Sequence, residues 1–553
     1  MSQANGPRTG RPPIFASRGM VSSPHYLASE SGLKVLRQGG SAVDAAIALN
    51  LTMAVVYSHM AGIGGDCFWL LAGGKAKGVE AIRASGPSAK NATIEHYREH
   101  GHTTTIPDRG PLAVLTVPGA LDGFRIAHER HGKLPWIELF TDAIHYARHG
   151  FAVTRSLAEW LVKDEQLLNE YPCMAETFLP TGKPQREGSH LAQPKLADTL
   201  ELIARMGVRA AFYEGEIAER ICASLQPKGS PLSTEDFSDY HAEWVTPISA
   251  SYRGYDIYQI PPSTQGFTAL QALNLLEGYD VASWGDNTVE YYHHMAEVMK
   301  VAFADRDEWL TDPSFVDIPL DTLLSKAYAD ERRKLIKISR SLPAGKVEPG
   351  LRYGPDFHKP SPLGGTVYFC VTDSDGLMVS KIQSPYYDFG ACIMGGDTGI
   401  IMQNRGSFFS LDEKHPNRLE PKKQTFHTII PALAMKDGKP AIAFGTMGGE
   451  GQSQTQAAIL TRLIDFGYDV QQAIEAPRWL LGRTWGMESR DLWMEADIPD
   501  NVLRELSLRG QSVKLIGRWD SIAGHAQAIR WNADTGFYEG GADPRGDGCA
   551  IGY

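Results

Sequence analysis

The chain has 553 residues, of which 42% are hydrophobic and 22% are charged, an ordinary globular composition that is sufficient for one large core or two domains. Its formal net charge is −11 and no basic cluster stands out, which argues against a nucleic-acid partner. No stretch is apolar for long enough to span a membrane, and residues 1–20 lack the apolar segment of a secretory signal, so we expect a soluble, cytoplasmic protein without a membrane partner.

The first half of the chain has mainly helical periodicity. Apolar residues recur at helical spacing over residues 26–36 and 42–56, and a glycine turn separates the two runs. Ser41, followed three residues later by Asp44, indicates an N-cap with an acidic first turn for the second helix. Further helices are predicted over residues 118–131, 136–149, 196–206 and 291–305.

The second half of the chain favours strands. The pattern alternates from Tyr252, and residues 342–365 are rich in Pro, Gly and Lys, which predicts an extended connector. Beyond it, three pairs of apolar runs flank turn signals and predict hairpins: TVYFCVT–DSDG–LMVSKIQS, TIIPALAM–KDG–KPAIAFG and QAIRW–NADTG–FYEGG. Together with a helix over residues 454–465, these hairpins predict an α+β protein in layers, with an antiparallel sheet buried on both faces.

Several motifs that carry chemistry are weak or absent in this chain. The stretch GIGGD, residues 62–66, follows a helix and precedes a strand, which is the reverse of a phosphate-binding loop, so close backbone packing is the better interpretation. The chain contains no G-x-S-x-G elbow, which disfavours a serine hydrolase. The turn that opens GGEGQSQTQ, residues 448–456, suits an oxyanion pocket at a helix N-terminus, and a plain tight turn is an equally good interpretation.

Metal-binding patterns are weak as well. His96 and His100 are four residues apart, but their polar surroundings predict an exposed helix, and the pair His293-His294 is not part of an HExxH pattern. The six cysteines form no C-x-x-C pair, so we expect reduced thiols, most of them buried, and neither a disulfide framework nor a zinc site. We expect no metal and no other cofactor.

The step from Gly365 to Thr366 has two interpretations. In the first, a loop simply ends where a strand begins. In the second, the chain cuts itself there, and the threonine becomes an N-terminal nucleophile whose own α-amine, with an ordinary pKa near neutrality, serves as the base. Glycine before the threonine tolerates the strained backbone that such an attack requires. Taken alone, the step does not decide between the two.

The chain resembles the gamma-glutamyltranspeptidase family of N-terminal-nucleophile hydrolases from about Ala16 to Tyr553. The blocks that carry the resemblance occur in the family's order: GMVSSPHYLASESGLKVLRQGGSAVDAAIALNLTMAVVYSHMAGIGGDCFWLL, TVPGALDGF, YRGYDIYQIPPSTQGF, ADRDEWLTDPSF, TVYFCVTDSDGLMVS, FGTMGGEG and DPRGDGCAIGY. The resemblance implies that the precursor cuts itself between Gly365 and Thr366. The large chain 1–365 and the small chain 366–553 then stay together as one domain, a four-layer αββα sandwich.

The resemblance also implies roles for individual residues. Thr366 is the expected nucleophile, and Ser384 stands where the family has a second threonine that hydrogen-bonds it. Gly448 and Gly449 match the family's paired glycines at the oxyanion hole.

Other positions depart from the family's pattern for gamma-glutamyl substrates. Tyr368 replaces the third residue of a Thr-Thr-His or Thr-Ser-His run, and Ala92 is the best match to an arginine expected within RASGPSAKNATIEHY. Phe408 replaces the aspartate that holds the glutamyl amine, with Arg405 just before it, and His427 together with Thr428 replaces a pair of serines. We therefore expect Arg405, His427, Thr428 and Tyr368 to form the substrate pocket.

These departures imply a member of the family's divergent branch, which contains acylases and amidohydrolases such as oxamate amidohydrolase. We expect it to hydrolyse an amide whose small acyl group carries a carboxylate and needs no α-amine, because Arg405 favours an anion and Phe408 offers nothing to an ammonium group. Two alternatives stay open: a gamma-glutamyl hydrolase or transpeptidase acting on glutathione-like substrates, and an unprocessed, inactive binding protein. The sequence also leaves a homo-oligomer open.

Overall fold

The computed structural model describes residues 10–354, 365–482 and 489–553. Two seven-stranded sheets form its centre, and neighbouring strands in both are antiparallel. Sheet A has the strand order β1 (Ile14–Ala16), β18 (Phe537–Ala542), β17 (Ala526–Asn532), β13 (Lys439–Thr446), β12 (Ala432–Lys436), β9 (Tyr255–Gln259) and β8 (Ile248–Tyr252). Sheet B has the order β19 (Cys549–Gly552), β2 (Met20–Ser23), β10 (Gly365–Thr372), β11 (Met378–Tyr386), β3 (Asp66–Ala72), β4 (Val79–Ala84) and β7 (Glu243–Val245).

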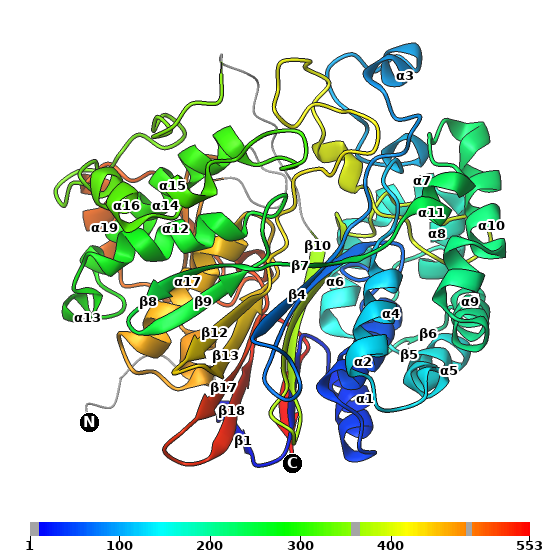
Figure 1. Ribbon diagram of the computed structural model, residues 1–553, viewed down its shortest axis with the longest axis horizontal. Coiled ribbons are helices and arrows are strands. Elements are labelled where there is room, and N and C mark those ends of the chain that lie inside the picture. The colour runs from blue at the N-terminus through cyan, green and yellow to red at the C-terminus, as the bar shows by residue number, and fades with distance from the viewer. Residues whose placement is uncertain (1–9, 355–364, 483–488) are drawn as a thin grey trace.

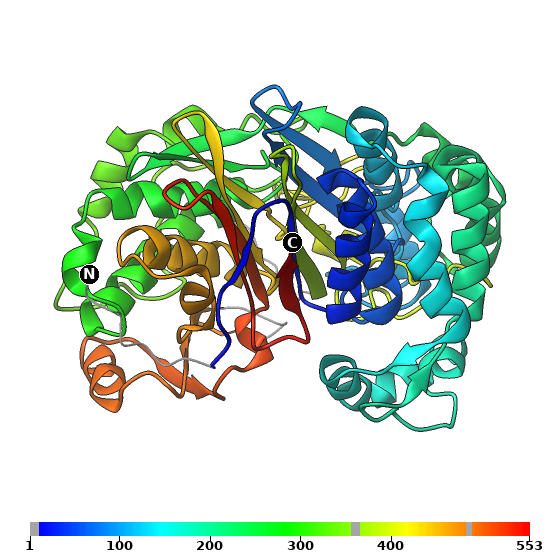
Figure 2. The ribbon, with the colours of Figure 1, turned by 90° about the horizontal axis from the view of Figure 1, so that it is seen from below.

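The two sheets pack against each other, as Figures 1 and 2 show from two directions. The space between them is filled by side chains from both sheets, among them Phe68, Tyr368 and Ile382 from sheet B and Leu433, Ala443 and Ile529 from sheet A. Every residue of β10 and β11 is buried, because these strands have the other sheet on one face and helices on the other. The predicted antiparallel sheet buried on both faces is confirmed.

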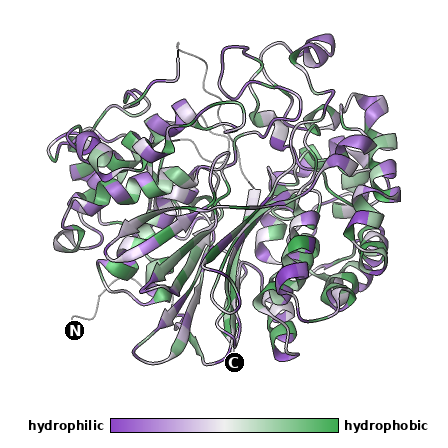
Figure 3. Cartoon of the chain, viewed as in Figure 1, coloured by the Kyte–Doolittle hydropathy of each residue, from purple (hydrophilic) through white to green (hydrophobic). Residues whose placement is uncertain are grey.

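Helices cover the outer face of each sheet (Figure 1). Against sheet B lie α1 (Tyr26–Arg37), α2 (Ala42–Val56) and α4 (Ala120–His131), and against sheet A lie α12 (Gly266–Glu277), α17 (Gly451–Ile464) and α18 (Val470–Glu475), with α14 (Val289–Trp309) packed on α12 and α17. Figure 3 shows apolar colouring on strands and on the helix faces turned toward them. The burial of apolar area in these layers is the main source of stability.

The remaining elements extend these layers. The other helices are α3 (Ile94–Glu99), α5 (Thr141–His149), α6 (Arg155–Lys163), α7 (Glu165–Glu170), α8 (Pro172–Phe178), α9 (Pro194–Met206), α10 (Glu216–Leu225), α11 (Thr234–Asp239), α13 (Val281–Trp284), α15 (Leu320–Leu323), α16 (Lys326–Arg333) and α19 (Asp500–Leu508). Two small sheets contain β14 (Trp479–Leu481), β15 (Leu492–Glu495) and β16 (Val513–Ile516), and β5 (Phe151–Ala152) and β6 (His190–Leu191).

Most elements predicted from the sequence are present. The first two helices, the helix over 196–206 and the three C-terminal hairpins are confirmed as α1, α2, α9, β10–β11, β12–β13 and β17–β18. Ser41 and Asp44 form a capping box, in which each side chain accepts a hydrogen bond from the other's backbone N–H. The helix predicted over 136–149 is divided, because residues 136–140 form a 3₁₀ turn before α5 begins. The connector over 342–365 falls partly on residues 355–364, which lie outside the described part.

The structure also places the histidines and cysteines. His96 lies on the short helix α3 and His100 at its end, and each donates a hydrogen bond from a ring nitrogen to a backbone carbonyl. His293 and His294 are buried in α14. All six cysteines are free, and four of them are buried. Within residues 10–354, 365–482 and 489–553, no cluster of three or more potential ligands could hold a metal ion, and none of the helices described is both long and apolar enough to cross a bilayer.

Candidate active site

Thr366 is the second residue of β10 and lies at one end of the space between the sheets. Its side chain is almost completely buried, and its Oγ1 has no hydrogen-bond partner among the described residues. The pairing of β10 with β11 shifts register between Gly365 and Val367, so the strand is irregular at this point. A buried hydroxyl without a partner is costly, and such groups are retained at sites where a reacting group completes the contacts.

Ser384 contacts the carbonyl that precedes Thr366. Its Oγ lies 2.5 Å from the carbonyl oxygen of Gly365 and donates a hydrogen bond to it. The same Oγ accepts hydrogen bonds from the backbone N–H of Tyr386 at 2.8 Å and from Nη2 of Arg405 at 3.1 Å. Because a guanidinium donates to this hydroxyl, the hydroxyl is a stronger donor in turn, and the Gly365 carbonyl is polarised.

Gly448 and Gly449 form the turn between β13 and the N-terminus of α17. Their φ angles are +125° and +55°, a region that favours glycine, and Gly451 N–H donates to the Gly448 carbonyl at 2.9 Å. The sequence left an oxyanion pocket and a plain tight turn as alternatives; the structure has a turn followed by a helix N-terminus, and the oxyanion pocket stays a prediction. Gly445, three residues before the turn, packs against β10, because a Cβ there would collide with the ring of Tyr368.

Arg405 is a buried cation with unsatisfied donors. It begins a 3₁₀ turn, residues 405–408, and its guanidinium lies 4.4 Å from the ring centroid of Tyr386. Its Nε and Nη1 have no partner among the described residues, and the side chain is fully buried. Burial lowers the pKa of Arg405 to about 10, which still leaves it charged at neutral pH. A buried charge with two free donors indicates a place for an anion.

The other residues predicted for the pocket have different surroundings. His427 is fully buried, neither ring nitrogen has a partner among the described residues, and its pKa is lowered well below the ordinary value, mainly by burial and then by Arg405 and Arg83. Gln265 donates from its Nε2 to the carbonyls of Thr428, at 2.7 Å, and of Gly449, at 3.1 Å. This amide therefore joins the His427-Thr428 segment to the glycine turn.

Tyr368 and Phe408 are core residues on either side of this region. The hydroxyl of Tyr368 lies 2.8 Å from Oγ of Ser380 within the packing between the sheets, so the structure gives this side chain a core role where the sequence predicted a substrate contact. Phe408 stacks on Tyr386 with ring centroids 4.3 Å apart and packs on Phe426. Position 408 therefore provides no carboxylate to pair with an ammonium group.

Two charged residues of this region escaped the sequence prediction. Ala92, the predicted match to the family's arginine, is buried on the helix side of sheet B. Arg83 is the first residue of the same segment and belongs to β4, where it pairs with Phe68 of β3. Its charge contributes to lowering the pKa of His427. Asp66, the last residue of GIGGD, lies opposite Ser384 on the neighbouring strand and is fully buried. The signal that could have found them was their charge within otherwise apolar or small-residue segments.

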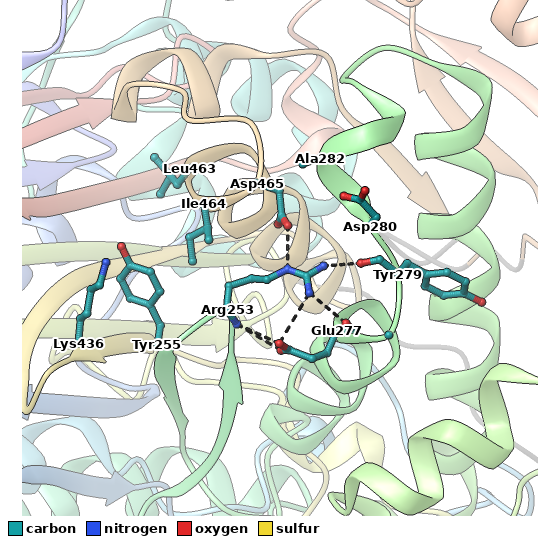
Figure 4. A pocket seen from close by; sticks show the side chains of 11 residues that line it. Arg253, Tyr255, Glu277, Tyr279, Asp280, Ala282, Lys436, Leu463, Ile464 and Asp465 are labelled. Carbon is teal, nitrogen blue, oxygen red and sulfur yellow. Dashed lines mark hydrogen bonds and ion pairs between the residues drawn. The ribbon is translucent and has the colours of Figure 1, made fainter. Parts of the chain in front are cut away.

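A pocket lies away from this region, at the ends of two helices that cover sheet A. Figure 4 shows this pocket of about 700 Å³, which is lined by the β8–β9 turn and by the ends of α12 and α17. Its central residue, Arg253, donates to Asp465 and to the backbone carbonyls of Glu277 and Tyr279. Because these partners already satisfy the arginine, the Thr366 region is the better candidate for the active site.

Comparisons with known proteins show the family to which the chain is similar. The sequence profile described as Gamma-glutamyltranspeptidase matches residues 28–553. The chain is 45% identical to the glutathione hydrolase-like YwrD proenzyme of Bacillus subtilis, covering 98% of this chain and 99% of that protein. It is 38% identical to the oxamate amidohydrolase proenzyme of Klebsiella pneumoniae, covering 97% and 99%. Its structure resembles that of cephalosporin acylase from Bacillus halodurans, with a TM-score of 0.91, 36% identity and coverage of 100% and 99%.

Proposed function

Because this chain belongs to the gamma-glutamyltranspeptidase family, we propose that it is a self-cleaving amidohydrolase whose nucleophile is Thr366. The fold is the four-layer αββα sandwich of N-terminal-nucleophile hydrolases, which the packing of two sheets between helix layers supports. The precursor divides into a large chain, residues 1–365, and a small chain, residues 366–553. Curated relatives that match along nearly the whole chain are described as proenzymes.

The two chains stay together after the cut because both sheets contain strands of both chains, hydrogen-bonded to each other. In sheet B, β10 of the small chain lies between β2 of the large chain and β11 of the small chain, and β11 in turn pairs with β3 of the large chain. In sheet A, β12 pairs with β9 and β18 pairs with β1. Separating the chains would break these ladders and expose the core between the sheets.

Self-cleavage begins with attack of Thr366 Oγ on the carbonyl carbon of Gly365. The Oγ–C bond forms, the peptide C–N bond breaks, and the proton of the hydroxyl passes to the departing nitrogen of Thr366, which leaves an ester. Water then hydrolyses the ester to the Gly365 carboxylate and restores the Thr366 hydroxyl beside a free α-amine. The hydrogen bond from Ser384 to the Gly365 oxygen supports this route, because negative charge develops on that oxygen during the attack.

The same hydroxyl then cleaves substrate amides. The freed amine of Thr366 accepts the hydroxyl proton as Oγ attacks the amide carbonyl, and it returns a proton to the leaving amine. Water resolves the acyl-enzyme. The N–H groups of the turn at Gly448 and Gly449 stabilise the oxyanion, a contribution of roughly 3 kcal/mol for each donor in comparable sites.

The substrate is an amide of a small acyl group that carries a carboxylate and needs no α-amine. The observation that carries this assignment is Arg405, a buried cation beside Ser384 whose Nε and Nη1 have no partner among the described residues. Phe408 offers no counter-charge for an ammonium group. The oxamate amidohydrolase relative, whose name gives an amide of this kind, agrees with the assignment. The alternative, a gamma-glutamyl hydrolase, is favoured by the name of the glutathione hydrolase-like relative.

A direct substrate comparison tests the proposal. Purified wild-type protein is assayed with oxamate, for ammonia release, and with gamma-glutamyl-p-nitroanilide and glutathione. We expect turnover of the oxamate-type amide and at least tenfold lower kcat/KM for both glutamyl substrates, and Thr366→Ala should abolish all three activities. Efficient turnover of the glutamyl substrates without activity on oxamate-type amides would contradict the assigned substrate class.

A further inference from the structure

Asp66 is a carboxylate buried beside the candidate nucleophile. It is the first residue of β3, and its backbone position is fixed because a Cβ at the preceding Gly65 would collide with the carbonyl of Ser384. Since Asp66 and Ser384 are direct cross-strand partners, their side chains lie on the same face of sheet B, the face that carries Tyr368 and Ile382 into the space between the sheets. The close packing predicted for GIGGD therefore holds a carboxyl group at the active site.

The two oxygens of Asp66 have different environments. Oδ1 accepts hydrogen bonds from the backbone N–H groups of Gly86, at 3.3 Å, and Gly119, at 3.1 Å, and from Nε2 of Gln403, at 3.2 Å. Oδ2 is buried and has no partner among the described residues. Because Oδ1 is occupied by three donors, a proton on this carboxyl group is held at Oδ2, where it makes the group a hydrogen-bond donor.

Arg405 supplies the complementary half of the same region. It interacts electrostatically with Asp66, yet within the described part of the chain the two form neither a hydrogen bond nor an ion pair. Ser384 lies next to both, as cross-strand neighbour of the one and hydrogen-bond partner of the other. Two buried groups that each have an unsatisfied polar atom therefore both neighbour Ser384.

We propose that Asp66 is a specificity-determining residue that donates from protonated Oδ2 to the substrate's carboxylate while Arg405 binds the same carboxylate from the other side. This inference rests on the proposed function, in which the acyl group is anionic. It adds that Asp66 is protonated when the substrate is bound. The carboxyl groups of Asp66 and of the substrate then share one proton, and both face the guanidinium of Arg405. The arrangement favours a carboxylate without an ammonium group, because a protonated Asp66 has no charge to offer a cation.

The charges around Asp66 agree with this role. Burial raises the pKa of Asp66 to about 7, and Arg405 opposes that rise without cancelling it. The other titratable groups that interact with Asp66 are uncharged at neutral pH, because burial raises the pKa of Cys67 to about 11 and those of Tyr213 and Tyr240 well above the usual tyrosine value. A second carboxylate placed beside Asp66 raises its pKa further, so substrate binding above pH 7 takes up a proton.

The kinetic test compares wild-type protein with Asp66→Asn between pH 6 and pH 9. Asparagine keeps a donor at the same position and cannot ionise. With oxamate as substrate, we expect the ratio of wild-type to variant kcat/KM to fall roughly tenfold per pH unit above pH 7, because only the wild-type protein loses the proton of Asp66. The pH dependence that comes from the α-amine of Thr366 is common to both proteins and cancels in the ratio. With the uncharged methyl ester of oxamate, the ratio should not fall. A ratio for oxamate that is flat or rises with pH would overturn the proposal.

A binding measurement separates this inference from the proposed function. Calorimetry with oxalate at pH 8, in two buffers of different ionisation enthalpy, measures the protons taken up on binding to the mature wild-type protein. We expect an uptake approaching one proton per site, and close to none for Asp66→Asn. Uptake with no amidase activity on any substrate would leave the role of Asp66 standing while the proposed activity fails. Oxalate binding without proton uptake, or no oxalate binding, would overturn the role of Asp66. Either outcome is seen with the wild-type protein alone, so it does not depend on whether the variant folds.

Discussion

Replacing Ser384 with alanine should slow self-cleavage far more than it changes the fold. The hydroxyl donates to the Gly365 carbonyl at 2.5 Å, and that oxygen acquires negative charge as Thr366 attacks. Loss of one donor to an oxyanion slows comparable reactions by about 10²–10³-fold, or roughly 3–4 kcal/mol of activation free energy. Alanine also leaves the Tyr386 N–H and one Arg405 donor unpaired, at a cost of about 1–3 kcal/mol in folding stability for each.

The rate is measured by following newly synthesised precursor as it divides into two bands on denaturing gels. A matched control is Ser380→Ala, which removes an equally buried serine of the same strand and face whose hydroxyl bonds Tyr368. We expect Ser380→Ala to mature at close to the wild-type rate and Ser384→Thr, which keeps a hydroxyl, to mature within about tenfold of it. A folded Ser384→Ala protein that matures at the wild-type rate would refute this assignment of the oxyanion donor.

Two further substitutions test other parts of the account. Gly448→Ala places a side chain at φ +125° and should lower kcat for amide hydrolysis by at least about 10²-fold. The control Gly438→Ala, at φ +74° in an open turn, should leave kcat unchanged. Equal kcat values for the two variants would argue against an oxyanion role of the Gly448 turn. Lys381 is buried over the rings of Trp69 and Phe124, and burial lowers its pKa well below the ordinary value. The unfolded chain therefore binds more protons at this lysine than the folded chain does. Folding stability should rise with pH toward about 10.4, the ordinary pKa of lysine. Lys381→Met should raise Tm at pH 6 and flatten this dependence in thermal melts at pH 6 and 9, and an unchanged slope would contradict a neutral buried lysine.

Local patterns predicted most of the elements, and contacts between distant segments determined the rest. The hairpin β10–β11 follows from two apolar runs around an Asp-Gly turn, and α2 follows from its periodicity and capping box. The helix expected over 136–149 is divided because apolar spacing does not distinguish a 3₁₀ turn from the first turn of an α-helix.

The candidate site was predictable only in part for the same reason. Thr366, Ser384 and the glycine pair at 448–449 were identified through the family resemblance, and their roles stay predictions. Asp66 was assigned to backbone packing, because its position beside the nucleophile depends on its pairing with Ser384, more than 300 residues away in the chain. Tyr368 was placed in the substrate pocket because the pattern of one strand does not show which residues the opposite sheet covers.

The most direct test of the account is the mass and N-terminal sequence of the purified protein. We predict two chains, the smaller beginning Thr366-Val367-Tyr368, and a single uncut chain for Thr366→Ala. A wild-type protein that remains one 553-residue chain without amidase activity would favour an inactive binding protein. A small chain that begins at another residue, or maturation of Thr366→Ala into two chains, would contradict the assignment of Thr366 as the nucleophile.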